Sequence, residues 1–113
     1  MNNIRYVKDI LNKYKFAKVQ NLNIKLELQY SEKDNNEDLK KLYKNNQIII
    51  NKINAGLSEL NQYELNIINE LYLNNTPITN KELYKKLGLS NNAFYKYKNK
   101  IINKFMMKAF PIK

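Results

Sequence analysis

The chain has 113 residues with a formal net charge of +10, and it contains neither cysteine nor histidine. Disulfides are therefore impossible, and the side chains that most often bind transition metals or act as general bases are missing, so we expect no metal site, no cofactor, no catalytic residue and no enzyme activity. The length fits one domain, or a small domain with a helical arm, and because no apolar run approaches the roughly 20 residues that span a bilayer, we expect a cytoplasmic protein without a membrane partner.

The first predicted element is a helix from about Asn3 to Val19, because apolar residues recur there at spacings of three and four. The next segment, Leu22–Tyr30, is ambiguous. Its strict alternation of apolar and polar residues is typical of a strand, whereas the pairs Leu22/Leu26 and Ile24/Leu28 are four residues apart and fit a helix. A single strand would have no partner in this chain, so we favour a helix and keep the strand as the alternative.

The stretch Ser31–Asp38 contains no apolar residue and is predicted to be a loop or linker. A long helix is predicted after it, from Leu39 to about Leu60, with Gly56 weakening its end. Its apolar face contains Leu39, Leu42, Tyr43, Ile49, Ile50, Ile53, Leu57 and Leu60. This face either belongs to the intramolecular core or forms a dimer seam, and its poor heptad pattern favours the core.

A capping box at Asn61 and Glu64 predicts the start of the next helix, since the side chain of each residue can bond the backbone amide of the other. The apolar face of this helix would contain Leu65, Ile68 and either Leu71 or Tyr72. The turn-forming residues 74–77, NNTP, then end it.

A second capping box, Thr79 with Glu82, predicts a short helix over Asn80–Leu87. Gly88 follows this helix directly, and glycine adopts the left-handed conformation that ends a helix at no steric cost. Ser90 is then a favoured cap for another helix, so that a three-residue turn joins the two. This arrangement is the pattern of a helix-turn-helix.

The last helix is predicted to run from Asn91 to about Met107, with two faces of different character. Apolar residues at spacings of three and four define a core face of Phe94, Tyr97, Ile101 and Phe105. The opposite face is polar and contains Asn92, Lys96, Asn99 and Asn103, flanked by Tyr95 and Lys100.

The basic charge of the chain is concentrated around this helix pair. Residues 61–113 carry nine basic and three acidic side chains, against eleven and seven in residues 1–60, and no acid follows Glu82. A block of one sign beside side-chain amides suits the phosphates and base edges of DNA. Four of the lysines are expected to be surface residues with only diffuse attraction to DNA, namely Lys85, Lys86, Lys98 and Lys108.

Residues 60–110 resemble region 4 of sigma factors, and more closely the ArpU family of phage transcriptional regulators. The matching segments are LNQYELNIINELYL, ITNKELYKKLGLS and NNAFYKYKNKIINKF followed by MMKAF, with a double aromatic at Phe94 and Tyr95, a basic residue at Lys98, and the pair Lys104 and Phe105 near the end. The resemblance implies an all-α fold in which an N-terminal helical arm (1–60), for bracing or oligomerisation, precedes a three-helix DNA-binding domain (61–113). It also implies a phage- or prophage-encoded regulator of late genes in the cytoplasm of a bacterial host.

When a helix-turn-helix binds DNA, the N-terminal end of its second helix reaches base edges and its first helix crosses the backbone. The expected base-reading residues are Asn91, Asn92, Tyr95, Lys96 and Asn99. The expected phosphate contacts are Thr79, Asn80, Lys81, Lys100 and Lys104. Asparagine can pair with adenine, and the single arginine, Arg5, lies outside this region, so an A·T-rich site is expected.

Double-stranded DNA is therefore the expected partner, with host RNA polymerase and a second copy of the chain as further candidates. Two other functions would also fit a small helix-turn-helix. One is a phage DNA-packaging adaptor similar to a small terminase subunit, which would assemble into a large ring. The other is an interaction module that binds RNA polymerase with little reading of DNA sequence, which co-purification with polymerase in the absence of DNA would support.

Overall fold

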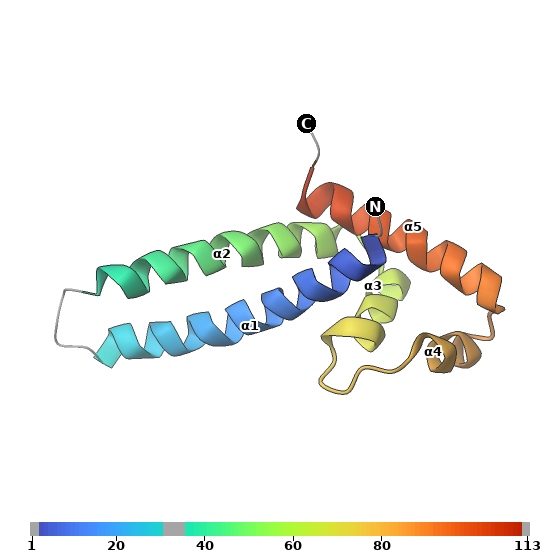
Figure 1. Ribbon diagram of the computed structural model, residues 1–113, viewed down its shortest axis with the longest axis horizontal. Helices are drawn as coiled ribbons and strands as arrows, with labels where there is room; N and C mark the ends of the chain where they lie inside the picture. Colours follow the sequence, from blue (N-terminus) through green and yellow to red (C-terminus); the bar gives the residue numbers. More distant parts are fainter. Residues whose placement is uncertain (1–2, 31–35, 112–113) are drawn as a thin grey trace.

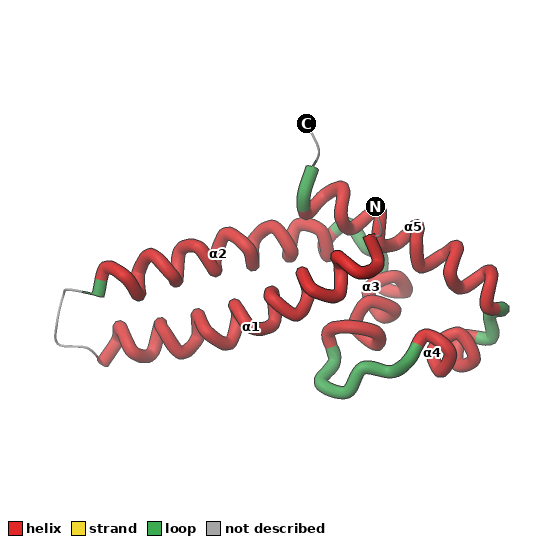
Figure 2. The backbone as a smooth tube through the Cα atoms, in the orientation of Figure 1, coloured by secondary structure: helices red, strands yellow, loops and turns green. Residues whose placement is uncertain are grey.

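The computed structural model describes residues 3–30 and 36–111, and every regular element within these ranges is helical (Figure 2). The elements are α1 (Asn3–Tyr30), α2 (Glu37–Ser58), α3 (Gln62–Ile68), the π-helical turn η1 (Asn69–Leu73), α4 (Asn80–Leu87) and α5 (Asn91–Ala109). The predicted all-α fold is therefore confirmed for this part of the chain. None of these helices combines the length and the apolar character that crossing a membrane requires.

Helices α1 and α2 run antiparallel, side by side, and form an elongated arm (Figure 1). Helix α3, η1 and α4 form a head at one end of this arm. Helix α5 begins beside α4 and ends against the arm, so that it connects the two parts. The long dimension of the molecule, 58 Å against 35 and 23 Å in the other two directions, reflects the length of the arm.

Helix α1 is continuous from Asn3 to Tyr30, so the helical interpretation of Leu22–Tyr30 is confirmed and the strand alternative is wrong. The alternation arises because this part of α1 carries apolar side chains on two opposite faces. Ile24 is buried on the side toward α2, whereas Leu22 and Leu26 are exposed on the outer side.

The predicted loop Ser31–Asp38 falls partly on residues 31–35, which lie outside the described residues. The prediction is wrong at its end, because α2 already begins at Glu37, with Asn36 at the N-cap position. Glu37 and Asp38 occupy the first turn of α2, where negative side chains are stabilised by the partial positive charge of the helix N-terminus. The same polar composition that indicated a loop therefore also suits a helix start.

A polar layer fixes the register of the arm. The side-chain amide of Asn46 donates to Oε1 of Gln20 at 2.8 Å and to Oδ1 of Asn21 at 3.0 Å. Asn21 in turn donates from Nδ2 to the carbonyl of Tyr43 at 3.1 Å. Because Asn21 and Asn46 are buried, sliding one helix along the other would leave buried amides without these partners, which disfavours other registers.

The predicted apolar face of residues 39–60 belongs to the core in its second half. Ile50, Ile53 and Leu60 are buried there, whereas Leu42 and Ile49, nearer the tip of the arm, are exposed. The core interpretation of this face is therefore confirmed for the end of α2 that lies next to the head.

The first capping box is present at the start of α3. The amide of Glu64 donates to Oδ1 of Asn61, and the amide of Asn61 donates to Oε1 of Glu64, both at 2.9 Å. The chain remains helical as far as predicted, but its last turn is the wider η1, in which the amide of Asn74 donates to the carbonyl of Asn69. Helical spacing of apolar residues does not distinguish this wider turn from an α-helical one.

One hydrophobic core joins the arm to the head. Its most deeply buried side chains are Val7, Leu11, Ile53, Ile67, Ile68, Leu83, Phe94, Ile101, Ile102 and Phe105. The predicted boundary between residues 60 and 61 falls inside this core. The division into two domains stays a prediction, but α5 is packed by residues from both sides of that boundary.

The closest approach between arm and α5 depends on Gly56. A Cβ atom added to Gly56 would lie 2.7 Å from Cδ1 and 2.8 Å from the carbonyl oxygen of Phe105. Such distances are well below van der Waals contact, and one of the two atoms belongs to the backbone. The glycine that weakens α2 as an isolated helix therefore allows α5 to pack directly on it.

We predict that Gly56→Ala destabilises the protein by about 1 to 3 kcal/mol, because the added methyl group overpacks the contact with Phe105. The sign of the stability change is informative, because at an exposed position of a helix alanine would stabilise the protein by about 1 kcal/mol relative to glycine. Urea unfolding followed by circular dichroism measures the difference. Asn45→Ala on the exposed face of α2 is the control and should change stability by less than about 0.5 kcal/mol; a higher unfolding midpoint for Gly56→Ala would contradict the packing described here.

Candidate nucleic-acid interface

The helix pair α4–α5 has the boundaries that its capping signals predict. The hydroxyl of Thr79 accepts from the amide of Glu82 at 3.1 Å, and Gly88 is left-handed with a φ of 71°. The hydroxyl of Ser90 accepts from the amide of Ala93 at 3.2 Å and caps α5. Only the far end differs slightly, since α5 continues two residues beyond the predicted Met107.

Aromatic contacts hold α4 against the start of α5. Leu83 is buried, the rings of Tyr84 and Phe94 are 5.8 Å apart, and Tyr95 meets Phe94 edge-on at 5.4 Å. Tilted and edge-on ring pairs at this separation are favourable. The first turns of α5 are thus fixed relative to α4 by side chains rather than by the three-residue turn alone.

The predicted core face of α5 is correct at three of its four positions. Phe94, Ile101 and Phe105 are fully buried, but Tyr97 is only half-buried, with its ring 5.7 Å from that of Tyr63. Ile102 is fully buried although the prediction did not include it. The reason is that the second half of α5 is covered by the arm as well as by the head, which widens the buried sector of the helix.

The expected base-reading residues occupy the first half of α5. Asn91, Asn92, Lys96 and Asn99 are exposed, and Tyr95 is half-buried. This half of α5 lies at the end of the molecule opposite the tip of the arm (Figure 1). The structure therefore brings these five side chains together on one accessible stretch of helix.

The expected phosphate contacts are in less uniform surroundings. Thr79, Lys81, Lys100 and Lys104 are exposed and Asn80 is half-buried. The Thr79 hydroxyl is 3.0 Å from the carboxylate of Glu82, which also accepts the Thr79 amide. Neither side chain of this capping box reaches the amides of Asn80 and Lys81, so these two backbone groups are the better candidates for a phosphate.

Three lysines of the basic block form ion pairs with acids of the preceding segment. Nζ of Lys104 is 2.9 Å from Glu64, Nζ of Lys108 is 3.4 Å from Glu59, and Nζ of Lys86 is 3.5 Å from Glu70. Their charges are partly compensated inside the protein. Among the described residues, Lys81, Lys85, Lys96 and Lys100 form no such ion pair, although Lys100 interacts electrostatically with Glu64. Fewer lysines therefore carry an uncompensated charge than the sequence indicates.

The prediction that Lys98 is a surface lysine is wrong. This residue is 3% exposed, and its Nζ donates to Oδ1 of Asn80 at 2.8 Å. The same nitrogen lies 5.6 Å from the ring centre of Tyr72 and 5.8 Å from that of Tyr95, which are cation–π distances. Burial lowers the pKa of Lys98, while burial and, secondarily, the neighbouring Tyr95 raise the pKa of Tyr72 to about 12.

Lys98 thus connects α5 to η1 and to the first residue of α4, and it contacts one of the expected base-reading side chains. The sequence contains a signal for its burial. Position 98 follows Phe94 by four residues and precedes Ile101 by three, so it lies on the same helical stripe as the buried side chains.

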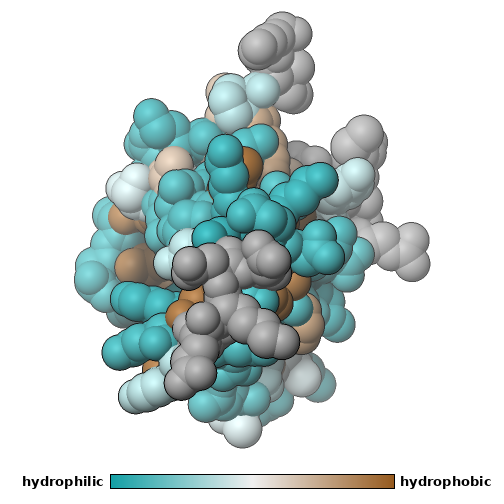
Figure 3. Space-filling model, turned by 90° about the vertical axis from the view of Figure 1, so that its left-hand side faces the viewer, coloured by the Kyte–Doolittle hydropathy of each residue, from teal (hydrophilic) through white to brown (hydrophobic). Residues whose placement is uncertain are grey.

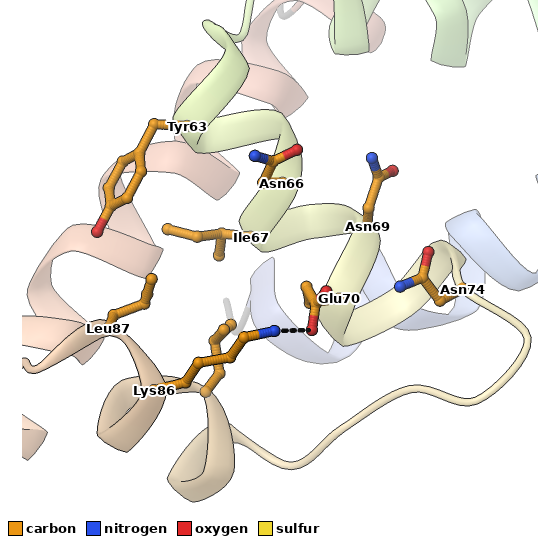
Figure 4. A pocket seen from close by; sticks show the side chains of 9 residues that line it. Tyr63, Asn66, Ile67, Asn69, Glu70, Asn74, Lys86 and Leu87 are labelled. Carbon is orange, nitrogen blue, oxygen red and sulfur yellow. Dashed lines mark ion pairs between the residues drawn. The ribbon is translucent and has the colours of Figure 1, made fainter.

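A hollow of about 500 Å³ lies between α3, η1 and α4 (Figure 4). Tyr63 and the amides of Asn66, Asn69 and Asn74 line it, and the ion pair between Lys86 and Glu70 crosses it. This pair joins α4 to η1. It adds a third connection, beside the aromatic contacts and Lys98, that fixes α4 in place.

Comparison of the chain with known protein families, curated proteins and solved structures finds no match.

The buried carboxylate of Glu64 generates a prediction about pH. The backbone amide of Asn61 contributes most to holding the pKa of Glu64 below its usual 4.5; burial opposes this effect, and Lys104 and Lys100 reinforce it. Because the folded-state pKa is the lower one, the carboxylate stabilises the folded state fully above about pH 4.5 and loses that effect as the pH falls through the folded-state pKa.

We predict that Glu64→Gln is less stable than the wild type at pH 7 and that its deficit shrinks on acidification to about pH 3, where the wild-type carboxylate is itself increasingly protonated. Urea unfolding midpoints at both pH values measure this. Glu59→Gln, at an exposed carboxylate 3.4 Å from Lys108, is the control and should have only a small effect at either pH. An equal deficit for Glu64→Gln at both pH values would exclude the ionised cap as its cause.

Proposed function

We propose that this protein is a sequence-specific DNA-binding transcriptional regulator that inserts the first half of α5 into the major groove. One observation supports this proposal most directly. The first half of α5 presents side-chain amides and unpaired lysine ammonium groups on one exposed face, while its other face is held by buried aromatic and aliphatic side chains. Amides can read base edges and ammonium groups can contact phosphates or guanine, so this face has the chemistry that DNA recognition requires.

The rigidity of α5 supports reading rather than diffuse attraction. Base recognition needs side chains on an element whose position is fixed to within about 0.5 Å. Here Phe94 anchors the first turns of α5 on α4, and Phe105 anchors its second half against Gly56 of the arm. A flexible basic tail would bind phosphates without such anchoring.

The dimensions of the helix pair fit the proposed mode of binding. A major groove about 12 Å wide admits one α-helix. With α5 in the groove, the start of α4 would approach the backbone, so that the amides of Asn80 and Lys81 and the positive end of the helix dipole would face a phosphate. Lys100, one turn beyond Lys96, would reach a second phosphate where α5 leaves the groove.

In this proposal α3, α4 and α5 correspond to the three helices of a sigma region 4 type domain, and the chain is an ArpU-like regulator. The resemblance of residues 60–110 supports both assignments, together with a role at phage or prophage late genes in a bacterial cytoplasm. Host RNA polymerase is a second proposed partner on the same basis. Because asparagine pairs with adenine and the reading face has no arginine, an A·T-rich operator is proposed.

The proposal predicts different effects for two exposed lysines of α5. Lys96→Ala should relax preference at one or two base pairs and weaken binding to the cognate site by about 1 to 3 kcal/mol, because Lys96 lies among the base-reading residues. Lys100→Ala should instead weaken binding to all sequences about equally and lower the dependence of affinity on salt by roughly one unit, because a phosphate contact releases a counterion. Binding titrations at several salt concentrations, with cognate and altered duplexes, measure both quantities.

Lys41→Ala is the matched control, since Lys41 is an exposed lysine of α2 on the arm. It should change neither sequence preference nor salt dependence appreciably, and all three variants should keep the wild-type circular dichroism spectrum. If Lys96→Ala and Lys100→Ala lower the salt dependence equally and leave sequence preference unchanged, α5 is a basic surface and not a reader. An interaction module that binds polymerase would then be the better explanation.

A further inference from the structure

The outer face of α1 carries five large apolar side chains that are between 47% and 79% exposed. They form the α1 stripe, which consists of Phe16, Val19, Leu22, Leu26 and Tyr30. Their spacings of three and four place them on one side of the helix, opposite the side on which Asn21 and Ile24 are buried toward α2. Figure 3, which looks at the tip of the arm, shows hydrophobic side chains at the surface between polar ones.

The character of this face changes where the head ends. In the first half of α1, the side facing the head carries lysines: Nζ of Lys15 donates to the carbonyl of Tyr72 at 3.2 Å, and Lys8 lines a hollow together with Tyr72 and Asn80. Lys15 is followed on the same face by Val19 and Leu22. Beyond Lys15 the face remains apolar although neither the head nor α2 covers it, which simple exposure to water does not favour.

The area of the α1 stripe is large enough for a specific interface. With aromatic side chains offering about 150 to 250 Å² each and aliphatic ones less, the exposed parts add up to on the order of 500 Å² of apolar surface. This is near the upper end of the largest apolar patch on a typical monomer, about 300 to 600 Å². A stable interface buries about 800 Å² on each side, of which roughly 60% is apolar, so one stripe supplies the apolar area that one side of a dimer needs.

We propose that the α1 stripe is a homodimer interface, in which the stripe of one copy packs antiparallel against the stripe of a second copy. The antiparallel direction of the two α1 helices follows from the position of the head. The head projects from the same side of α1 as the stripe, so two parallel arms would bring both heads into the space between them. In the antiparallel arrangement each head lies beyond the tip of the other arm.

This packing brings apolar side chains of the two copies together and leaves the charged ones in solvent. Leu22 of one copy meets Leu26 of the other, and Val19 lies near Tyr30. The flanking positions Lys18 and Lys25 are exposed and form part of a polar rim, as is usual around an apolar interface centre.

The arrangement has a consequence for DNA binding. Two molecules 58 Å long that overlap over the distal half of α1 place their α5 helices at opposite ends of the dimer, roughly 90 Å apart at a rise of about 1.5 Å per residue. Half-sites one helical turn apart are only about 34 Å apart, so such a dimer would not occupy adjacent half-sites and would instead contact sites several helical turns apart or on two DNA segments. This consequence rests on the proposed DNA binding, whereas the interface itself does not.

Sedimentation and light scattering of the full chain without DNA test the interface. We expect the wild type to be a dimer at about 100 μM, and we expect the double substitution Leu22→Asp with Leu26→Asp to weaken dimerisation at least about 100-fold, since it buries opposed carboxylates in an apolar seam. Ile48→Asp is the matched control, because Ile48 is 48% exposed on α2, outside the stripe, and this variant should remain a dimer. A monomeric wild type would overturn the proposal, and so would equal masses for the double aspartate variant and Ile48→Asp.

Cysteine cross-linking tests the direction and does not depend on the aspartate variants folding, since the chain has no native cysteine. A mixture of Leu22→Cys and Leu26→Cys chains should form a disulfide-linked heterodimer under mild oxidation. Val19→Cys alone should form none, because two copies of residue 19 would lie about 15 Å apart along antiparallel helices. Efficient disulfide formation by Val19→Cys would overturn the antiparallel arrangement, and both measurements can fail while DNA binding by α5 remains intact.

Discussion

The close contact of Gly56 with Phe105 determines how the rest of the molecule is arranged. Because a glycine on α2 leaves no side chain between the helices, the second half of α5 packs directly on the arm. Its first half projects beyond the arm and is anchored in the shared core by Phe94. The projecting half is the part proposed to enter DNA. The arm is therefore part of what positions the candidate interface, since the same helix contributes to both.

The lysines of the second half of the chain have distinct physical roles. Three of them form ion pairs with acids that precede α4 in the sequence: Lys86 connects α4 to η1, Lys104 joins α5 to α3, and Lys108 joins α5 to the end of α2. Lys98 is buried between two tyrosine rings and Asn80. The charge that remains for a polyanion is consequently concentrated beside the amides of α5, at one end of an elongated molecule.

Local features could be predicted from sequence, and features that depend on distant contacts could not. Both capping boxes, the left-handed Gly88 and the start of α5 were correct because each depends on residues within a few positions of one another. The burial of Ile102 and the shared core were missed because they depend on how the arm covers α5. Tyr97 and Lys98 were missed although they face Tyr63 and Tyr72 of the head, because the contacts of α5 with these residues are not local in the sequence. Of the candidate site, four of the five expected base-reading residues lie exposed on α5 and Tyr95 is half-buried, whereas Asn80 and Lys104 are engaged with other side chains. The role of these five residues in base reading stays a prediction.

Sequence reading by α5 can be tested by selection from a random pool of double-stranded DNA. Repeated binding and amplification with the full chain, at about 150 mM salt so that diffuse attraction is weakened, enriches whatever sequence the protein prefers. The account predicts a recurring A·T-rich motif with most of its information in a few adjacent base pairs, the length that one recognition helix can contact. A pool that retains binding but shows no enriched motif would contradict it.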